Sequence, residues 1–295
     1  MFVGFRIIVF GFCVAVLSFA NAFAADVTYK KDEHGRILVP VHFGDQVYNY
    51  LLATSSRRIG VRDGNLDALN IKRFRRSVLE EFSITGEVKL PMGGLPKMTL
   101  ANRPILDRYV TIFNEKSAVA GVIGFDAFGE QLVHINPASQ IVGLHAHAGN
   151  FASQGWHIIN GRNNRYGGII VQVEYMGVML DVLFASSVSH SMLDLKAYSA
   201  LKQGLPARKK RGGFADVMTG INATTTVIPT QLLPDFKIGG WALGDIEVVT
   251  SKLNVSDNAS SGDALLLILG ADVMTSREFT LDYRDFQIWY PDNQR

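Results

Sequence analysis

The same succession of sequence signals occurs twice in this chain of 295 residues. In each copy, alternating apolar and polar residues lead through a glycine-bearing turn to a second apolar stretch that ends in small residues. Nine residues separate Gly44 from Ala53 in the first copy, and eight separate Gly177 from Ala185 in the second. A period of two around a glycine turn predicts a β-hairpin. Each copy is therefore expected to place a small-residue turn at the end of a buried strand.

The later parts of the two copies also correspond. Stretches of helical character follow at residues 66–71 and 193–202, and hairpin tips are expected at Thr85-Gly86 and Thr219-Gly220. Both copies then reach an apolar-apolar-Gly-x-Asp segment that contains Asp126 or Asp272, and end in paired strands, 132–136 with 140–144 and 279–282 with 286–290. Many short β segments in a duplicated order predict an all-β protein with two lobes.

The first residues have the pattern of a secretory signal peptide. Arg6 precedes an apolar run over residues 7–19, and small residues suited to cleavage follow directly. We expect a signal peptide over 1–24, a first lobe over 25–147, a linker over 148–166 and a second lobe over 167–295. A retained membrane anchor is the alternative reading. The mature protein would be exported to a bacterial periplasm or the extracellular space, with no transmembrane segment.

Composition excludes several classes of chemistry. The single cysteine, Cys13, lies inside the signal, so the mature chain has no thiol for a disulfide or a nucleophile. His145 and His147 alternate near a strand end but lack a third ligand, and no glycine-rich phosphate loop is present, so no metal and no cofactor are predicted. The formal charge of +2 gives no general expectation of nucleic-acid binding.

The duplicated pattern resembles the pepsin-like and retropepsin-like aspartic proteases. Lobes of that family place Asp-Thr/Ser-Gly-Ala/Ser after a buried strand, and an apolar-apolar-Gly segment braces the loop. The resemblance covers residues 37–290 and implies an all-β, two-lobed pepsin-like fold built from two retropepsin-like repeats. It puts Ala53 and Ala185 in the places of the two catalytic aspartates; the positions that follow them are Thr54, Ser55 and Ser56, and Ser186, Ser187 and Val188.

The family's reaction needs two carboxyl groups that share a proton, one acting as base and the other as acid. A methyl group can do neither, so we expect no aspartic peptidase activity and an absent or degenerate catalytic site. Ser55 and Ser187 also replace glycines of the pattern. Thr54 and Ser186 keep the hydroxyls that, in the family, hydrogen-bond across the two loops.

The sequence offers two other catalytic arrangements. The serines of the two turns together with His190 suggest a nucleophile and a base, but hydroxyl-rich turns commonly satisfy their own backbone, and no orienting acid is identifiable. Asp181 lies four residues before Ala185, about 13 Å away along a strand at ~3.3 Å per residue, too far to act as a substitute acid. Asp126 and Asp272 are expected to cap a helix or turn.

Two basic runs occupy equivalent places in the repeats. Each is either a solvated loop face or a docking site for an anionic partner, such as an acidic protein surface, phospholipid headgroups or a polyanionic envelope polymer. The residues are Lys72, Arg73, Arg75 and Arg76 in the first copy, and Arg208, Lys209, Lys210 and Arg211 in the second.

The sequence therefore favours an exported, inactive protease-like module that holds an extended peptide or protein segment in a cleft between the lobes. An active hydrolase with a non-standard constellation and a structural protein that docks through its basic loops remain alternatives. The cleft is expected to be lined by Ala53, Ser55, Ser56, Thr85, Gly86, Ala185, Ser187, Thr219 and Gly220.

Overall fold

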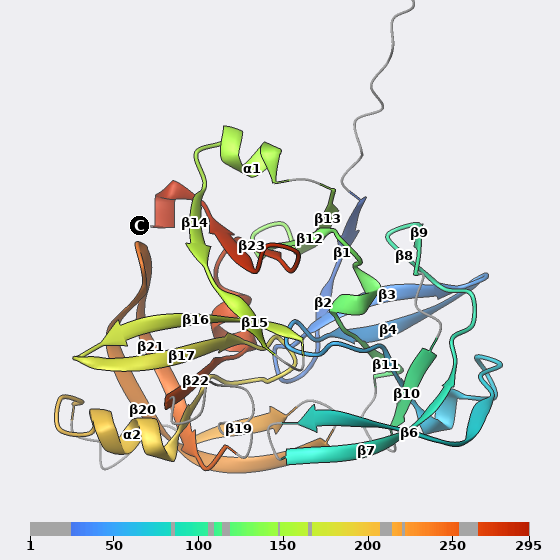
Figure 1. The fold of residues 1–295 in the computed structure, drawn as a ribbon, viewed down its shortest axis with the longest axis horizontal. Helices are drawn as coiled ribbons and strands as arrows, with labels where there is room; N and C mark the ends of the chain where they lie inside the picture. Colours follow the sequence, from blue (N-terminus) through green and yellow to red (C-terminus); the bar gives the residue numbers. More distant parts are fainter. Residues whose placement is uncertain are drawn as a thin grey trace, which may run out of the picture.

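Three β-sheets make up most of the protein in the computed structural model (Figure 1). The structure describes residues 25–83, 86–105, 109–113, 119–146, 148–164, 167–206, 214–219, 222–253 and 265–294. One ten-stranded sheet belongs to the first repeat, one eight-stranded sheet belongs to the second, and a six-stranded sheet combines strands of both. The predicted all-β, two-lobed architecture is confirmed.

The ten-stranded sheet has the order β6-β7-β10-β5-β11-β4-β3-β8-β9, with β2 paired to β3. Its hairpin of β3 and β4 is the one that the alternation around Gly44 predicts, and β4 then pairs in parallel with β11. Its elements are β2 (Lys30–Lys31), β3 (Ile37–Phe43), β4 (Gln46–Leu52), β5 (Gly60–Arg62), η1 (Asp63–Asn65), β6 (Arg73–Ser83), β7 (Gly86–Gly94), β8 (Thr99–Leu100), β9 (Arg103–Pro104), β10 (Tyr109–Phe113), β11 (Gly121–Ile123) and η2 (Phe125–Ala127).

The eight-stranded sheet has the order β15-β16-β17-β22-β18-β21-β20-β19 and repeats this arrangement. The β16–β17 hairpin corresponds to β3–β4, and β17 pairs in parallel with β22 as β4 does with β11. Its elements are β15 (Arg162–Asn164), β16 (Gly168–Tyr175), β17 (Val178–Phe184), β18 (Met192–Asp194), α2 (Leu195–Leu201), β19 (Phe214–Thr219), β20 (Asn222–Ile238), β21 (Trp241–Ser251), β22 (Leu265–Leu269) and α4 (Ala271–Met274).

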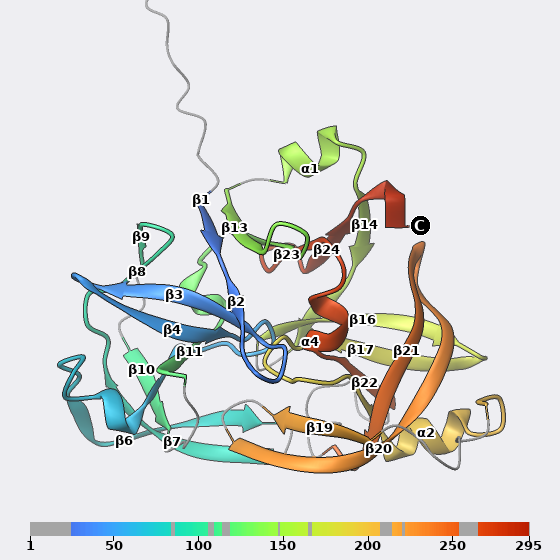
Figure 2. The same cartoon turned by 180° about the vertical axis from the view of Figure 1, so that it is seen from behind.

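The six-stranded sheet joins the two repeats. The two predicted terminal hairpins meet in its middle, where β12 pairs with β23 so that His134 lies opposite Thr280. Figures 1 and 2 show this sheet above the two lobes, while the hairpins β6–β7 and β19–β20 approach each other from opposite sides below. Its strands are β1 (Ala25–Thr28), β12 (Leu132–Asn136), β13 (Ile141–His145), β14 (His157–Asn160), β23 (Phe279–Asp282) and β24 (Gln287–Tyr290). A 3₁₀ turn, η3 (Asp292–Gln294), follows β24.

The predicted linker is more regular than its turn-rich composition suggested. It contains the short helix α1 (Gly149–Ser153), and β14 and β15 extend the six-stranded and eight-stranded sheets, respectively. The linker therefore forms part of two sheets instead of spanning the gap between lobes as an irregular segment.

One of the two expected helical stretches is wrong. Residues 193–202 contain α2, capped by the Asp194 carboxylate, which accepts a hydrogen bond from the Lys196 amide. Residues 66–70 are turns that follow η1, because the chain reverses where Asn70 takes a φ of 53° and the Ile71 amide bonds back to the Leu66 carbonyl. A left-handed residue ends helical propagation.

The largest apolar cluster has members in all three sheets. Trp241 of β21 is 1% exposed and stacks on Tyr290 of β24 at 5.6 Å between ring centroids. It also lies 5.7 Å from Phe279 of β23. These contacts fix the second lobe against the six-stranded sheet by burial of large aromatic surfaces.

His145 couples the stability of the six-stranded sheet to pH. Its ring packs on Phe151 of α1, and burial lowers its pKa, with His134 and Arg103 acting in the same direction and Asp26 against them. The unfolded chain then binds the proton more readily, so stability should fall as pH drops below the ordinary histidine value of about 6.5. Between about pH 7.5 and pH 5, we expect the melting temperature of the His145→Gln variant to fall by less than that of the parent protein. Parallel pH profiles for the two proteins would contradict this.

Candidate functional site

The two small-residue turns meet through Thr54 and Ser186, which are both fully buried. The Ser186 amide donates to Thr54 Oγ1 at 3.0 Å, and the Thr54 amide donates to Ser186 Oγ at 3.2 Å. Thr54 Oγ1 then donates to the Phe184 carbonyl at 2.8 Å, and Ser186 Oγ donates to the Leu52 carbonyl at 2.5 Å. Each hydroxyl thus accepts from one group of the opposite turn and donates to another. We call these four hydrogen bonds the Thr54–Ser186 grip.

Ala53 and Ala185 directly precede the two gripping residues, and each is 1% exposed. Their amides donate to the carbonyls of Ile123 and Leu269, both at 2.9 Å. Their own carbonyls accept from the residue three positions on, Ser56 at 3.1 Å and Val188 at 3.0 Å. The backbone of the two turns is therefore held by equivalent bonds. The side chain at the start of each turn is a methyl group.

The alanine methyls belong to two separate apolar clusters. Ala53 packs with Leu90 of β7 and Phe113 of β10, among others, and Ala185 packs with residues such as Ile170 and Leu183 of β16 and β17. Neither position offers an acid, a base or a nucleophile. Both alanines contribute to packing where a carboxylate would need hydrogen-bonding partners.

The predicted Gly-containing segments brace the turns through their backbone. The amides of Phe125 and Ala271, each just after its glycine, donate to the carbonyls of Ser56 at 3.0 Å and Val188 at 2.7 Å. A Cβ atom at Gly124 would lie 2.4 Å from the Arg58 carbonyl oxygen, and one at Gly270 would lie 2.6 Å from the His190 carbonyl carbon. Both contacts are with backbone atoms, so these positions require glycine.

The acidic residues of the two bracing segments do not occupy the N-cap positions of η2 and α4. The N-cap positions are the glycines, and neither has a side-chain cap. Asp126 forms ion pairs with Arg58 at 2.8 Å and with Arg57 at 3.5 Å. Asp272 accepts from the Ser191 amide at 3.0 Å and hydroxyl at 2.9 Å. Each carboxylate thus ties its bracing segment to the chain that follows the small-residue turn.

The carboxyl group of Asp272 lies beside the second turn. Burial raises its pKa, and the hydrogen bonds from Ser191 oppose the rise. Its two oxygens are engaged by Ser191, whereas His190 Nδ1 lies 3.3 Å from Ser189 Oγ. These contacts do not form a nucleophile, base and acid in series.

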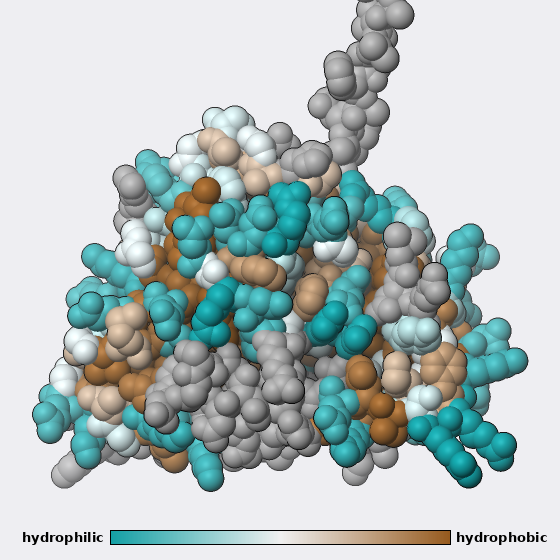
Figure 3. All heavy atoms as spheres, viewed as in Figure 1, coloured by the Kyte–Doolittle hydropathy of each residue, from teal (hydrophilic) through white to brown (hydrophobic). Residues whose placement is uncertain are grey.

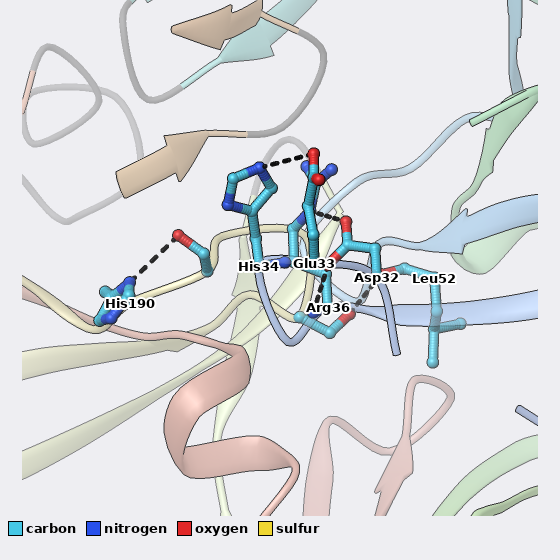
Figure 4. A network of polar contacts seen from close by, with 8 residues as sticks. Asp32, Glu33, His34, Arg36, Leu52 and His190 are labelled. Atoms are coloured by element: carbon cyan, nitrogen blue, oxygen red, sulfur yellow. Dashed lines mark hydrogen bonds and ion pairs between the residues drawn. The ribbon is translucent and has the colours of Figure 1, made fainter. Parts of the chain in front are cut away.

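Figure 4 shows His190 together with Leu52 and a charged turn of the first repeat. In that turn Arg36 is 2% exposed, and its Nε donates to Asp32 Oδ2 at 2.7 Å. Asp32 also accepts from the Arg36 amide at 2.9 Å. The sequence reasoning missed this partly buried ion pair, because its spacing does not distinguish it from a solvated turn.

Tyr283 was also missed by the sequence reasoning. Its hydroxyl donates to the Thr54 carbonyl at 2.9 Å, and its ring stacks on Phe125 at 5.2 Å between centroids. Burial raises the pKa of Tyr283 far above its ordinary value, so the phenol stays a hydrogen-bond donor. The available signal was its position directly after the predicted strand 279–282.

The remaining turn residues lie close to the grip in different environments. Ser55 and Ser56 are half-buried, and Ser187 is 8% exposed. Ser56 Oγ lies 3.5 Å from the Arg58 carbonyl. A Cβ at Gly168 would come 3.1 Å from Ser55 Cα, so the start of β16 passes directly over the first turn.

The hairpin tips fall at the edge of the described structure. Ser83 pairs with Gly86 in the first repeat, and Thr219 pairs with Asn222 in the second, so both predicted hairpins are present. Thr85 and Gly220 lie outside the described residues, as do His147 and the second basic run, Arg208, Lys209, Lys210 and Arg211.

Asp181 lies away from the turns in a structural ion pair. It is 1% exposed on β17 and bonds to Arg162 of β15. The arginine accounts for the burial of this carboxylate.

The described residues offer neither a metal site nor a membrane-spanning helix. They contain no cluster of three or more histidine, cysteine, aspartate or glutamate side chains that could hold a metal ion. In the same part of the chain, no helix has the length and apolar character needed to cross a bilayer. A cavity of about 420 Å³ lies beside Asp126 and Phe128 and is lined by neither alanine.

Comparisons with known proteins give a fold and no sequence family. No family model matches the chain, and no curated protein sequence matches it. Its fold is similar to that of an aspartic proteinase from Irpex lacteus, with a TM-score of 0.51 at 15% identity, over 90% of this chain and 96% of that one. The two-lobed pepsin-like fold is therefore shown. The identity is too low to carry over an activity.

Removing a hydroxyl of the grip should destabilise the protein. In Thr54→Val the Ser186 amide loses its acceptor inside the core, at a cost of about 1–3 kcal/mol in the free energy of unfolding. Thr54→Ser keeps the hydroxyl and should retain the grip. In a double-mutant cycle, Thr54→Val and Ser186→Ala should be strongly non-additive, as measured by urea unfolding.

Thr280→Val provides the matched control. Thr280 is fully buried and its Oγ1 has no hydrogen-bond partner. The same substitution there removes an unsatisfied hydroxyl and should be neutral or stabilising. Equal losses at positions 54 and 280 would show that the grip contributes no specific stability.

Proposed function

We propose that this protein is an exported, catalytically inactive protease-like module that binds an extended peptide or protein segment between its two lobes. The observation that carries the proposal is the Thr54–Ser186 grip, formed in full while the residue before each gripping side chain is an alanine. The hydrogen bonds that hold the two turns together are formed, although neither turn has a carboxyl group at position 53 or 185 to transfer a proton.

The missing groups decide the chemistry. General acid and base assistance contributes about 10²–10⁴ in rate per group, and an aspartic peptidase relies on both. At positions 53 and 185 the side chains carry no titratable proton. Asp272 does not substitute, because Ser191 occupies both of its oxygens. Peptide hydrolysis by the two-carboxyl route is therefore not expected.

Two edge strands of the lobes are suited to bind an extended guest. β6 ends the ten-stranded sheet and β19 ends the eight-stranded one, and both belong to the hairpins that approach each other in Figures 1 and 2. An edge strand has unpaired backbone amides and carbonyls on one side, and an extended peptide can pair with them. Backbone pairing requires no catalytic residue.

Binding at this place requires a movement of the first hairpin. Leu90 of β7 and Ala53 belong to one buried cluster, so the structure describes a closed arrangement over the first turn. A guest would have to displace β7 from that cluster or use the outer edges of the hairpins. Apolar guest side chains fit best, because they would replace the contacts that Leu90 gives up.

Two assays on the purified protein test the proposal. The first measures cleavage of denatured casein across acidic and neutral pH, with and without pepstatin; we expect no turnover. The second measures the fluorescence anisotropy of a labelled pool of apolar octapeptides. Ser55→Trp, which fills the space at the first turn, should reduce binding at least tenfold. Ser139→Trp, in the exposed turn between β12 and β13, should leave it unchanged.

The two alternatives predict different results. Pepstatin-insensitive turnover with covalent labelling of Ser55, Ser56, Ser186 or Ser187 by a serine-directed probe would establish a non-standard hydrolase. Peptide binding that both tryptophan variants retain would remove the inter-lobe site from the proposal.

A further inference from the structure

A surface unrelated to the grip lies at the start of the β6–β7 hairpin. All five residues from Lys72 to Arg76 are exposed, and four of them are cations. Tyr109 at the start of β10 and Val78 on β6 are also exposed, at 44% and 58%. We call this surface the basic–aromatic patch; it consists of Lys72, Arg73, Phe74, Arg75, Arg76, Val78 and Tyr109.

The backbone explains why these side chains point outward. β6 pairs with β7 at Arg73 opposite Gly93, and the register then shifts before Val78 meets Pro91. Arg76, inside the shift, has a φ of 64°, a left-handed value that is uncommon for a residue with a side chain. Irregular pairing of this kind bends an edge strand and redirects its side chains.

The aromatic part of the patch is a ring pair open to solvent. Phe74 and Tyr109 meet edge to face, with ring centroids 5.7 Å apart and planes at 76°. Phe74 is 36% exposed although it is fully apolar. Gly94, which pairs with Tyr109, also lies beside the Phe74 ring: a Cβ there would be in ordinary van der Waals contact with it at 3.7 Å.

The cationic part of the patch is largely unneutralised. Arg73 pairs with Asp63, and both side chains are more than 40% exposed. Within the part of the chain that the structure describes, no ion pair involves Lys72, Arg75 or Arg76. In the view of Figure 3, strongly hydrophilic side chains project at the lower right, where β6 lies in Figure 1, beside hydrophobic ones.

We propose that the basic–aromatic patch docks the protein on an anionic phospholipid surface. Cations near a membrane are attracted by anionic headgroups, and aromatic rings gain by entering the boundary between headgroups and acyl chains. A soluble acidic macromolecule would use the cations but would leave Phe74, Val78 and Tyr109 in water. The combination of both parts on one edge favours the membrane. This proposal does not rest on peptide binding between the lobes, although both use the β6–β7 hairpin.

The experiment is co-sedimentation of the full chain with sucrose-loaded vesicles. Vesicles of phosphatidylcholine with phosphatidylglycerol should bind the protein, and phosphatidylcholine alone should not. Added salt should weaken the binding, because screening shortens the range of the attraction. The charge reversal Arg75→Glu with Arg76→Glu should lower the partition coefficient by at least about tenfold, since each cation near the surface is worth roughly a factor of five.

Two control pairs separate the patch from general effects. Lys202→Glu with Lys237→Glu changes the net charge equally at exposed sites of the second lobe and should bind as the parent does. Phe74→Ser with Tyr109→Ser should also weaken binding to the anionic vesicles, whereas Ile158→Ser with Met179→Ser, at other exposed positions, should not. Circular dichroism and melting temperature verify that each variant is folded.

Two outcomes would overturn the proposal. In the first, both control pairs reduce vesicle binding as much as the patch variants do. The binding would then depend on general properties such as net charge and not on the patch. In the second, the protein binds poly-glutamate at matched charge but does not bind vesicles, and Phe74→Ser with Tyr109→Ser leaves the poly-glutamate binding unchanged. The surface would then bind an acidic macromolecule instead of a membrane.

Discussion

The structure depends on a reciprocal exchange of hydrogen bonds between two hydroxyl side chains at the interface of the repeats. Thr54 and Ser186 are 130 residues or more from the backbone groups that they bind across the interface, and none of these groups is open to water. A buried amide or carbonyl left unpaired costs more than a single hydrogen bond gains, so the four bonds are held as a set. They fix the two turns in one relative position, and the bracing segments around Gly124 and Gly270 then fix the backbone behind them.

The alanines before Thr54 and Ser186 avoid the free-energy cost of burying two carboxyl groups side by side, which the chemistry of the aspartic proteases requires. Two carboxyl groups held in such an environment repel each other when both are ionised and lose hydration in either case. Methyl groups carry neither penalty, and both alanines pack into apolar clusters with their neighbours. On our proposal the protein retains the geometry of a reactive site and gains stability from the absence of reactive groups. The same substitution shifts the site toward apolar guests.

Much of the fold could be predicted because the sequence pattern of each main element occurs twice, once in each repeat. The hairpins around Gly44 and Gly177 and the terminal strand pairs follow from alternation and matched order. The meeting of Thr54 and Ser186 follows from the resemblance to the aspartic proteases. The exposed patch of the first basic run was partly foreseen, but its aromatic member Tyr109 comes from a strand distant in the sequence. The helix expected over residues 66–71 failed because tertiary contacts and a left-handed Asn70 override weak local propensity. Partly buried ion pairs such as Arg36–Asp32 have no periodic signature.

The two repeats are equivalent in backbone and different in the side chains that support it. Asp126 holds its bracing segment through arginines, whereas Asp272 uses the amide and hydroxyl of Ser191. The phenol of Tyr283, from the second repeat, supports the Thr54 carbonyl on the first turn. The ring of Tyr283 also stacks on Phe125 of the first bracing segment. One residue, placed directly after β23 of the six-stranded sheet, therefore contacts both the first turn and its bracing segment. A guest that displaces β7 from Ala53 therefore meets a turn fixed on its inner side. The movement that admits it must come from the hairpin, whose packing against the site is apolar and whose outer strand β6 pairs on one side only among the described strands.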